Sequence, residues 1–357
     1  ALNSYWFYSQ TNYADKHSQL VQKQIFSKQT NQALLLPQKQ AIGQLLITSV
    51  QGEQLTASES AWLSNGLISG YLLLGRNIKN PNQLKALTTS IYTAATPSGI
   101  LPFILIDQEG GSVSRIPWTN TQAQVAITTT KQAENVGKVR GQELRDLGIN
   151  MNLSPVVESS TNKDAFINIQ KRGFVKDAPK LAAVMVDGYH ASKLLTLAKH
   201  FPGGLAYTSV DPHQDLPYLP LDSNQVLLLC QEFKPVIENQ VDAIMVSHEL
   251  YPLIDSHPVP LSSWFLQTVL RDSLQFHGAI MVDDLSMGAV KSNYQVSDYA
   301  SKSLTAGADL LIISEPSDYE VVYRELLKTL MNKQLPYELV NQHLKYVRHL
   351  KHKITFD

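Results

Sequence analysis

Short apolar runs alternate with amphipathic stretches from residue 38 to the end of the chain. Each apolar run ends in polar or glycine residues, a pattern typical of strands that are buried on both faces. The runs predict eight strands, at 44–49, 70–75, 103–107, 150–156, 195–200, 243–248, 279–283 and 308–314. The clearest amphipathic stretches predict helices at 82–95, 130–147, 179–192, 224–239, 264–276, 319–332 and 339–351.

Eight alternating strands and helices indicate an α/β fold, either a (β/α)8 barrel or a doubly wound sheet. The spread of the repeats over roughly 310 residues favours a single TIM-type barrel. Because no proline-rich linker or low-complexity segment interrupts them, residues 38–357 are predicted to form one catalytic domain. Residues 1–37 begin with clustered aromatic side chains and continue with many Gln, Asn and Lys residues. They predict an N-terminal arm or short helix ahead of the domain.

Composition and charge exclude several classes of partner. Lys and Arg number 30 and Asp and Glu number 31, so no basic footprint for nucleic acid exists. No apolar stretch approaches the ~20 residues of a transmembrane helix, and the single cysteine, Cys230, excludes an intramolecular disulfide. We expect a monomer without nucleic-acid partners or a transmembrane segment. The aromatic arm and the absence of an initial methionine favour an exported, periplasmic protein over a cytoplasmic one.

Polar side chains that follow the predicted strands carry the candidate chemistry. The apolar strand at 279–283 ends in two adjacent carboxylates, Asp283 and Asp284. One aspartate at such a boundary is often only a helix cap, but two in a row favour a functional role. A barrel brings these carboxylates to the same rim as the polar side chains that end other predicted strands, which are Asp107, Lys199, His200 and His248.

Eight short motifs, in a fixed order, carry a resemblance to a known family. They are LLLGRN (72–77), IDQEGGSVSR (106–115), NLSPV (152–156), KRGF (171–174), KHFPGG (199–204), DPH (211–213), MVSHELYP (245–252) and VDDLSM (282–287). Together they resemble the bacterial β-N-acetylhexosaminidases of glycoside hydrolase family 3, single-domain enzymes that recycle peptidoglycan. The resemblance extends from about Ile42 to the C-terminus.

The resemblance implies a retaining double displacement with Asp283 as the nucleophile and a covalent glycosyl intermediate. The family's acid/base is a histidine oriented by an aspartate two residues earlier, which Asp211 and His213 match. An imidazole suits this task because it titrates near neutral pH and a carboxylate fixes its tautomer. The resemblance assigns no role to Asp284. We interpret this residue as a helix cap or as a hydrogen-bond acceptor behind the site.

The family's sugar-binding residues map onto five further positions: Asp107, Arg115, Arg172, Lys199 and His200. Charged side chains suit sugar hydroxyls because charge-assisted hydrogen bonds are strong and discriminate against substrates that lack the group. His248 either lines the pocket or packs beneath it. The expected substrate is a saccharide with a terminal GlcNAc, from peptidoglycan fragments or related oligosaccharides, and the expected activity needs no cofactor and no metal.

Several positions depart from the family pattern. Gly204 stands where the family usually has histidine, the loop to Asp211 is one residue longer, and Pro212 replaces a serine, which stiffens the backbone and removes a donor. Ser112 and Glu158 stand where arginine and aspartate are common. These changes bear on loop motion, rate and aglycone preference.

Three alternatives to hydrolysis stay open at this stage. A glycoside phosphorylase would use the same residues, because a histidine base repels phosphate less than a carboxylate. A catalytically silent saccharide-binding protein would explain the altered loop. A metal-dependent barrel enzyme is the weakest alternative, since the sequence has no compact ligand motif such as HExxH.

Overall fold

The computed structural model describes residues 36–159 and 161–355. The predicted N-terminal arm at 1–37 therefore lies almost entirely outside the described residues. Within them, no helix combines the length and apolar character that a membrane crossing requires.

Eight parallel strands close into one barrel in the order β1-β10-β9-β8-β7-β6-β3-β2. The strands are β1 (Leu46–Ser49), β2 (Gly70–Leu73), β3 (Phe103–Ile106), β6 (Met151–Asn152), β7 (Leu195–Phe201), β8 (Ala243–Val246), β9 (Ala279–Val282) and β10 (Leu310–Ile313). Every residue in them is buried, because the strands face the barrel interior on one side and the helices on the other. The predicted (β/α)8 barrel is confirmed, with a strand at each of the eight expected places.

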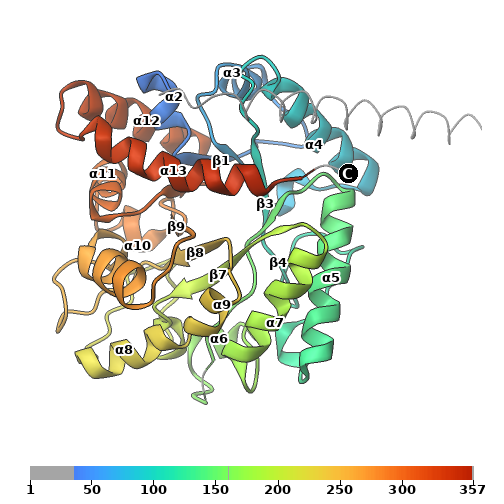
Figure 1. Cartoon of the computed structure of the whole chain (residues 1–357), viewed down its shortest axis with the longest axis vertical. Helices are drawn as coiled ribbons and strands as arrows, with labels where there is room; N and C mark the ends of the chain where they lie inside the picture. The colour runs from blue at the N-terminus through green and yellow to red at the C-terminus, as the bar shows by residue number, and fades with distance from the viewer. Residues whose placement is uncertain (1–35, 160, 356–357) are drawn as a thin grey trace, which may run out of the picture.

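Helices surround the barrel on its outer side (Figure 1). They are α2 (Gln38–Gly43), α3 (Ala57–Ser64), α4 (Pro81–Ala95), α5 (Thr130–Asp146), α6 (Phe166–Ile169), α7 (Ala178–Ala191), α8 (Ser223–Gln231), α9 (Lys234–Glu238), α10 (Gly288–Lys291), α11 (Val296–Ala306), α12 (Pro316–Met331) and α13 (Tyr337–Lys353). Reciprocal capping boxes start three of them, at Thr56, Thr129 and Asp222. Each box satisfies backbone N–H groups that the first helical turn leaves without partners.

Two predicted helices differ from the expectation. The stretch 224–239 forms two helices, α8 and α9, and Pro235 lies in the first turn of the second. Proline suits a first turn but lacks the N–H that a continuous helix would need there. The stretch predicted at 264–276 winds as a π-helix, η5 (Trp264–Ser273), a form that periodicity alone does not distinguish from an α-helix.

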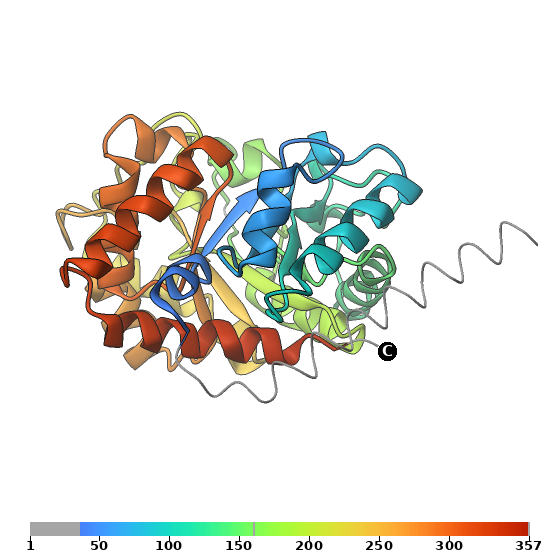
Figure 2. The same ribbon diagram turned by 90° about the horizontal axis from the view of Figure 1, so that it is seen from above.

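The C-terminal helix closes one end of the barrel. Figure 2 shows α13 in red alongside the ends of the strands. Lys351 on this helix donates to Gln44 Oε1 at 2.6 Å and to the Ser69 carbonyl at 3.0 Å, and its ammonium lies 4.9 Å from the Phe103 ring centre. These contacts lie at the N-terminal ends of β1, β2 and β3. The functional side chains therefore belong at the opposite end.

Candidate active site

A cavity of about 340 Å³ opens at the C-terminal ends of the strands. Eight of the nine candidate catalytic and sugar-binding residues line it, and His248 is the one that does not. The eight come from the ends of four barrel strands, β3, β6, β7 and β9, and the loops that follow them: Asp107, Arg115, Arg172, Lys199, His200, Asp211, His213 and Asp283. Such convergence on one rim is how TIM barrels build active sites.

The two adjacent aspartates after β9 have different surroundings. Asp283 donates its backbone N–H to the Val246 carbonyl at 3.1 Å, and its partly exposed carboxylate accepts the N–H of Asp284 at 2.8 Å. The Asp284 carboxylate accepts the backbone N–H groups of Ser314 at 2.8 Å and Ser286 at 2.9 Å, together with the Ser314 hydroxyl. Burial raises its pKa. Asp284 thus ties the end of β9 to the end of β10, whereas the Asp283 carboxylate stays available to the cavity.

The loop after β7 carries Asp211 and His213 as a hydrogen-bonded pair. His213 Nδ1 lies 2.7 Å from Asp211 Oδ1, and the His213 backbone N–H donates to the same oxygen at 2.9 Å. Partial burial alone would raise the pKa of Asp211, but these hydrogen bonds and the imidazole lower it below its usual value. The carboxylate therefore fixes the ring with Nδ1 toward Asp211 and Nε2 free.

Backbone hydrogen bonds dock this loop on helix α10, which follows the Asp283 segment. The Gly288 N–H donates to the His213 carbonyl at 2.9 Å, and the Ala289 N–H donates to the Pro212 carbonyl at 3.1 Å. A Cβ on Gly288 would lie closer than 3.0 Å to the His213 carbonyl, so only glycine permits this approach. The imidazole and the Asp283 carboxylate are thereby held on the same cavity.

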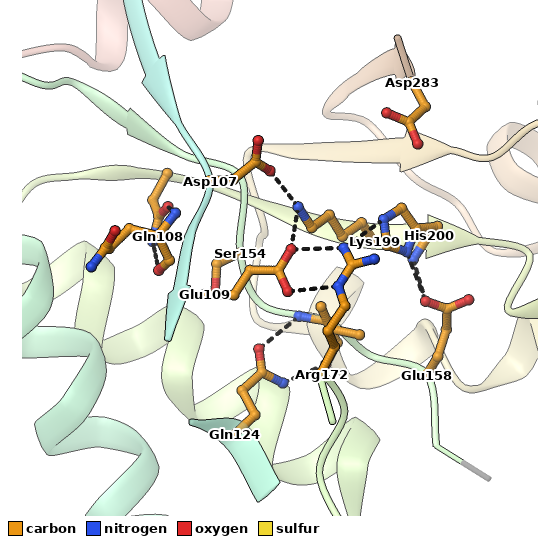
Figure 3. Close-up of polar contacts among 12 residues, drawn as sticks. Asp107, Gln108, Glu109, Gln124, Ser154, Glu158, Arg172, Lys199, His200 and Asp283 are labelled. Carbon is orange, nitrogen blue, oxygen red and sulfur yellow. Dashed lines mark hydrogen bonds and ion pairs between the residues drawn. The ribbon is translucent and has the colours of Figure 1, made fainter. Parts of the chain in front are cut away.

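A network of buried charges forms the cavity floor (Figure 3). Lys199 Nζ lies 2.6 Å from Asp107 Oδ1 and 2.6 Å from Glu109 Oε1. Arg172 donates to both oxygens of Glu109, at 3.0 Å and 2.8 Å. Although burial raises the pKa of Glu109, Arg172 and Lys199 lower it to about 2. Glu109 is therefore the anion that holds two cations in place under the cavity.

The tautomer of His200 follows from its neighbours. Arg172 Nη2 lies 3.2 Å from His200 Nε2, and a guanidinium can only donate, so Nε2 is the acceptor. Nδ1 then carries the proton and donates to Glu158 Oε2 at 2.8 Å, an oxygen that also accepts the His200 backbone N–H at 3.1 Å. Burial and the charges of Arg172 and Lys199 lower the pKa of His200 well below its usual value. The ring is neutral.

A short antiparallel ribbon after β3 positions Arg115. It consists of β4 (Gln108–Gly110) and β5 (Val113–Ser114). The Gln108 side chain accepts the backbone N–H of Arg115 at 2.8 Å and donates to the Ser114 hydroxyl at 2.8 Å. Arg115 Nε is buried and has no hydrogen-bond partner within residues 36–159 and 161–355. The Arg115 residue itself lines the cavity.

His248 packs beneath the site and does not line it. Its side chain is fully buried, with Nδ1 3.0 Å from the Tyr299 hydroxyl and Nε2 3.2 Å from the Asp284 carbonyl. Burial lowers its pKa and keeps the ring neutral. Within the part of the chain that the structure describes, no group of three or more His, Cys, Asp and Glu side chains is arranged to hold a metal ion.

Comparison with known proteins places this site in a family. The family model described as "Glycosyl hydrolase family 3 N terminal domain" matches residues 38–350. A beta-hexosaminidase of Methylobacillus flagellatus is 31% identical over 288 residues, which cover 76% of this chain and 81% of that protein. The chain belongs to glycoside hydrolase family 3. A beta-hexosaminidase of Haemophilus influenzae is 30% identical over 298 residues, which cover 80% of this family 3 chain and 84% of its relative.

Solved structures of the family agree with the fold. A glycoside hydrolase family 3 beta-N-acetylglucosaminidase from Paenibacillus sp. superimposes with a TM-score of 0.84 at 27% identity. The match covers 89% of this family 3 chain but only 63% of the Paenibacillus chain, which is considerably longer. The resemblance that the motifs carried is confirmed: the chain is a glycoside hydrolase of the bacterial beta-hexosaminidase group.

Sequence reasoning missed two carboxylates of this family 3 site, Glu109 and Glu249. Glu109 lies two residues after Asp107, and Glu249 directly follows His248. This closeness to residues already recognised at strand ends was the signal that could have identified them. The Glu249 side chain explains the departure at Gly204, because a Cβ on Gly204 would lie closer than 3.0 Å to Glu249 Oε2 and to the Tyr251 hydroxyl. The space that a side chain at 204 would need is thus occupied by Glu249 and Tyr251.

Proposed function

We propose that this chain is a retaining exo-β-N-acetylglucosaminidase that removes terminal GlcNAc from peptidoglycan fragments or related oligosaccharides. One observation carries the proposal: the Asp283 carboxylate and the Asp211–His213 pair line the same cavity. The Methylobacillus and Haemophilus relatives are named beta-hexosaminidases, and the Paenibacillus enzyme is a beta-N-acetylglucosaminidase. These names support the same substrate class for this chain.

In the first step, the Asp283 carboxylate attacks the anomeric carbon as the glycosidic bond breaks. The leaving oxygen takes a proton from protonated His213, so the aglycone departs as a neutral alcohol and the sugar stays esterified to Asp283. The negative charge of Asp211, 2.7 Å from Nδ1, supports the imidazolium before the transfer. The exposed position of His213 lets aglycones of different size reach the acid.

In the second step, neutral His213 takes a proton from water as the oxygen attacks the anomeric carbon. The ester to Asp283 breaks, and GlcNAc leaves with its original β-configuration because two inversions have occurred. His213 ends protonated and Asp283 ends ionised, so both groups return to their starting states. Orientation by Asp211 serves both steps because the same Nε2 gives and takes the proton.

Asp107, Arg115, Arg172, Lys199 and His200 bind the sugar in this proposal. Asp107 keeps one carboxylate oxygen free beside Lys199 and accepts from ring hydroxyls. The Arg115 guanidinium, which lines the cavity, donates to the substrate. Arg172 is already paired with Glu109, and Lys199 is already paired with Asp107. Both cations therefore meet the sugar in a fixed geometry and lose little conformational entropy on binding.

The test uses a chromogenic β-N-acetylglucosaminide with the wild type, Asp283→Ala and His213→Ala. We expect Asp283→Ala to abolish release. His213→Ala should lose about 10²–10⁴-fold on substrates with poor leaving groups. With a good leaving group it should give a burst and a protein mass increased by one GlcNAc residue, because the second step lacks its base. Activity that survives in Asp283→Ala would refute the assignment of Asp283 as the nucleophile. Formation of a sugar phosphate in phosphate buffer would show that the reaction is phosphorolysis and not hydrolysis.

A further inference from the structure

The backbone that follows Asp283 is held by hydrogen bonds on both sides. The Asp284 carboxylate accepts two backbone N–H groups, at 2.8 Å and 2.9 Å. The next backbone N–H, that of Leu285, donates to the Ile312 carbonyl at 2.8 Å, and the N–H of Asp283 itself donates to the Val246 carbonyl at 3.1 Å. The Asp284 N–H between them therefore has a fixed direction.

This fixed N–H contacts the proposed nucleophile directly. It donates to Asp283 Oδ1 at 2.8 Å, which sets the plane of the carboxylate. The contact occupies Oδ1 and leaves Oδ2 to attack the anomeric carbon. Attack needs the two reacting atoms about 3–3.5 Å apart and aligned, so the plane of this carboxylate matters for the rate.

His248 holds Asp284 from beneath the site. Its Nε2 lies 3.2 Å from the Asp284 carbonyl oxygen, and its Nδ1 lies 3.0 Å from the Tyr299 hydroxyl. A carbonyl can only accept, so Nε2 carries the proton. Burial lowers the pKa of His248, and the ring is neutral. Nδ1 is therefore an acceptor, and the Tyr299 hydroxyl donates to it.

Burial separates His248 and Tyr299 from the substrate. Both side chains are buried, and neither lines the cavity. Their rings pack edge to face, with centroids 5.5 Å apart and an interplanar angle of 72°. His248 therefore reaches the site through the backbone of Asp284 and not through the sugar.

We propose that His248 is a positioning residue for the nucleophile: by donating to the Asp284 carbonyl, it holds the Asp284 N–H on Asp283 Oδ1 and so orients Oδ2 toward the anomeric carbon. Tyr299 fixes the histidine in the Nε2–H tautomer that this contact needs. The positioning role rests on the proposed function, because it requires Asp283 to be the nucleophile. The tautomer of His248 does not depend on that function.

A misaligned nucleophile has a kinetic signature of its own. Asp283 attacks in the first step and leaves in the second, so both steps slow down together and kcat falls with little change in KM. Proton transfer by His213 is not affected. The loss should therefore be the same for substrates with good and with poor leaving groups, whereas the loss in His213→Ala grows as the leaving group becomes poorer.

The experiment compares two substitutions of His248 with the wild type. His248→Leu removes the donor to the Asp284 carbonyl, and we expect kcat to fall by about 10–100-fold on chromogenic β-N-acetylglucosaminides of both kinds. His248→Gln places an amide nitrogen near the position of Nε2 and keeps a donor there. It should recover most of the lost kcat.

Two further variants separate positioning from folding. His248→Leu leaves the buried Tyr299 hydroxyl without its acceptor, which lowers stability. The double variant His248→Leu/Tyr299→Phe removes this hydroxyl, so it should regain stability in urea unfolding but not kcat; it also carries the test if His248→Leu does not fold. His343→Leu is the matched control, since His343 is buried and its Nε2 lies 3.0 Å from the Leu304 carbonyl. Its other partner, Asp309, precedes β10 at the opposite end of the barrel, so kcat should stay at the wild-type value.

Four results would overturn the positioning role. They are an unchanged kcat in His248→Leu, a loss that grows with poorer leaving groups, a His248→Gln variant as slow as His248→Leu, and a kcat that returns with stability in the double variant. In ¹⁵N-labelled protein, the His248 ring should show the neutral Nε2–H tautomer at pH 7, and an Nδ1–H or charged ring would also contradict the proposal. The tautomer needs no substrate, and activity that survives in Asp283→Ala would refute the proposed function instead. The two failures are therefore distinguishable.

Discussion

Replacing Glu109 by glutamine should remove the anion that holds the cavity floor together. Glu109 is almost completely buried and binds Lys199 and Arg172 at once. A carboxyl whose pKa falls from 4.5 to about 2 on folding is stabilised by about 3 kcal/mol. Removing one partner of a buried ion pair costs about 3–5 kcal/mol by itself. We therefore expect Glu109→Gln to lose about 3 kcal/mol of unfolding free energy at pH 7.

The pH dependence distinguishes this loss from a simple packing defect. Because the pKa of Glu109 is lowered, its contribution is complete above about pH 4.5 and is lost as pH falls toward 2. The difference in unfolding free energy between the wild type and Glu109→Gln should therefore shrink as the solution is acidified. Urea unfolding at pH 7, 5 and 3 measures it, with Glu238→Gln as the exposed control. A difference below about 0.5 kcal/mol at pH 7, within the range of ordinary surface substitutions, would refute the reasoning.

Two glycine substitutions test the close approaches around the loop after β7. In Gly288→Ala, the new Cβ would crowd the Gln214 and His213 carbonyls. We therefore expect kcat on the chromogenic substrate to fall by about tenfold or more, with little change in KM. An unchanged kcat would contradict this expectation. In Gly204→Ala, the methyl would crowd Glu249 and Tyr251, so urea unfolding should show a loss of about 1–3 kcal/mol. Gly52→Ala is the control for both, because its Cβ would meet no atom within 4 Å.

The sequence predicted the barrel because its signal is repeated eight times. Each strand is a short apolar run buried on both faces, and one misjudged boundary does not alter the count. Boundaries were less predictable: the strand expected at 150–156 forms regular pairs only over Met151–Asn152 in β6. Pro155 lacks a backbone N–H and cannot continue the ladder, although an isolated bridge joins Val156 to Lys199 further on.

The candidate site was predictable where a functional residue directly follows a strand. It was less predictable where the role of a residue depends on its neighbours in space. Asp283 and the Asp211–His213 spacing were visible as motifs, and the structure brings them to one cavity. The role of Glu109 was not visible, because nothing in the sequence tells whether Arg172 faces a substrate or a buried carboxylate. The place of His248 was open for the same reason: its two hydrogen-bond partners lie 36 and 51 residues away.

The departures from the family pattern meet where the rigid floor joins the loop that carries His213. Gly204 makes room for Glu249 and for the Tyr251 hydroxyl, which donates to Glu249 Oε2 at 2.6 Å. The start of the loop is therefore packed against two fully buried side chains. Further along the loop, the Phe166 N–H donates to the Thr208 carbonyl at 2.6 Å, and the Gly288 N–H donates to the His213 carbonyl at 2.9 Å. Substitutions at Gly204 and Gly288 therefore test the two ends of this loop separately.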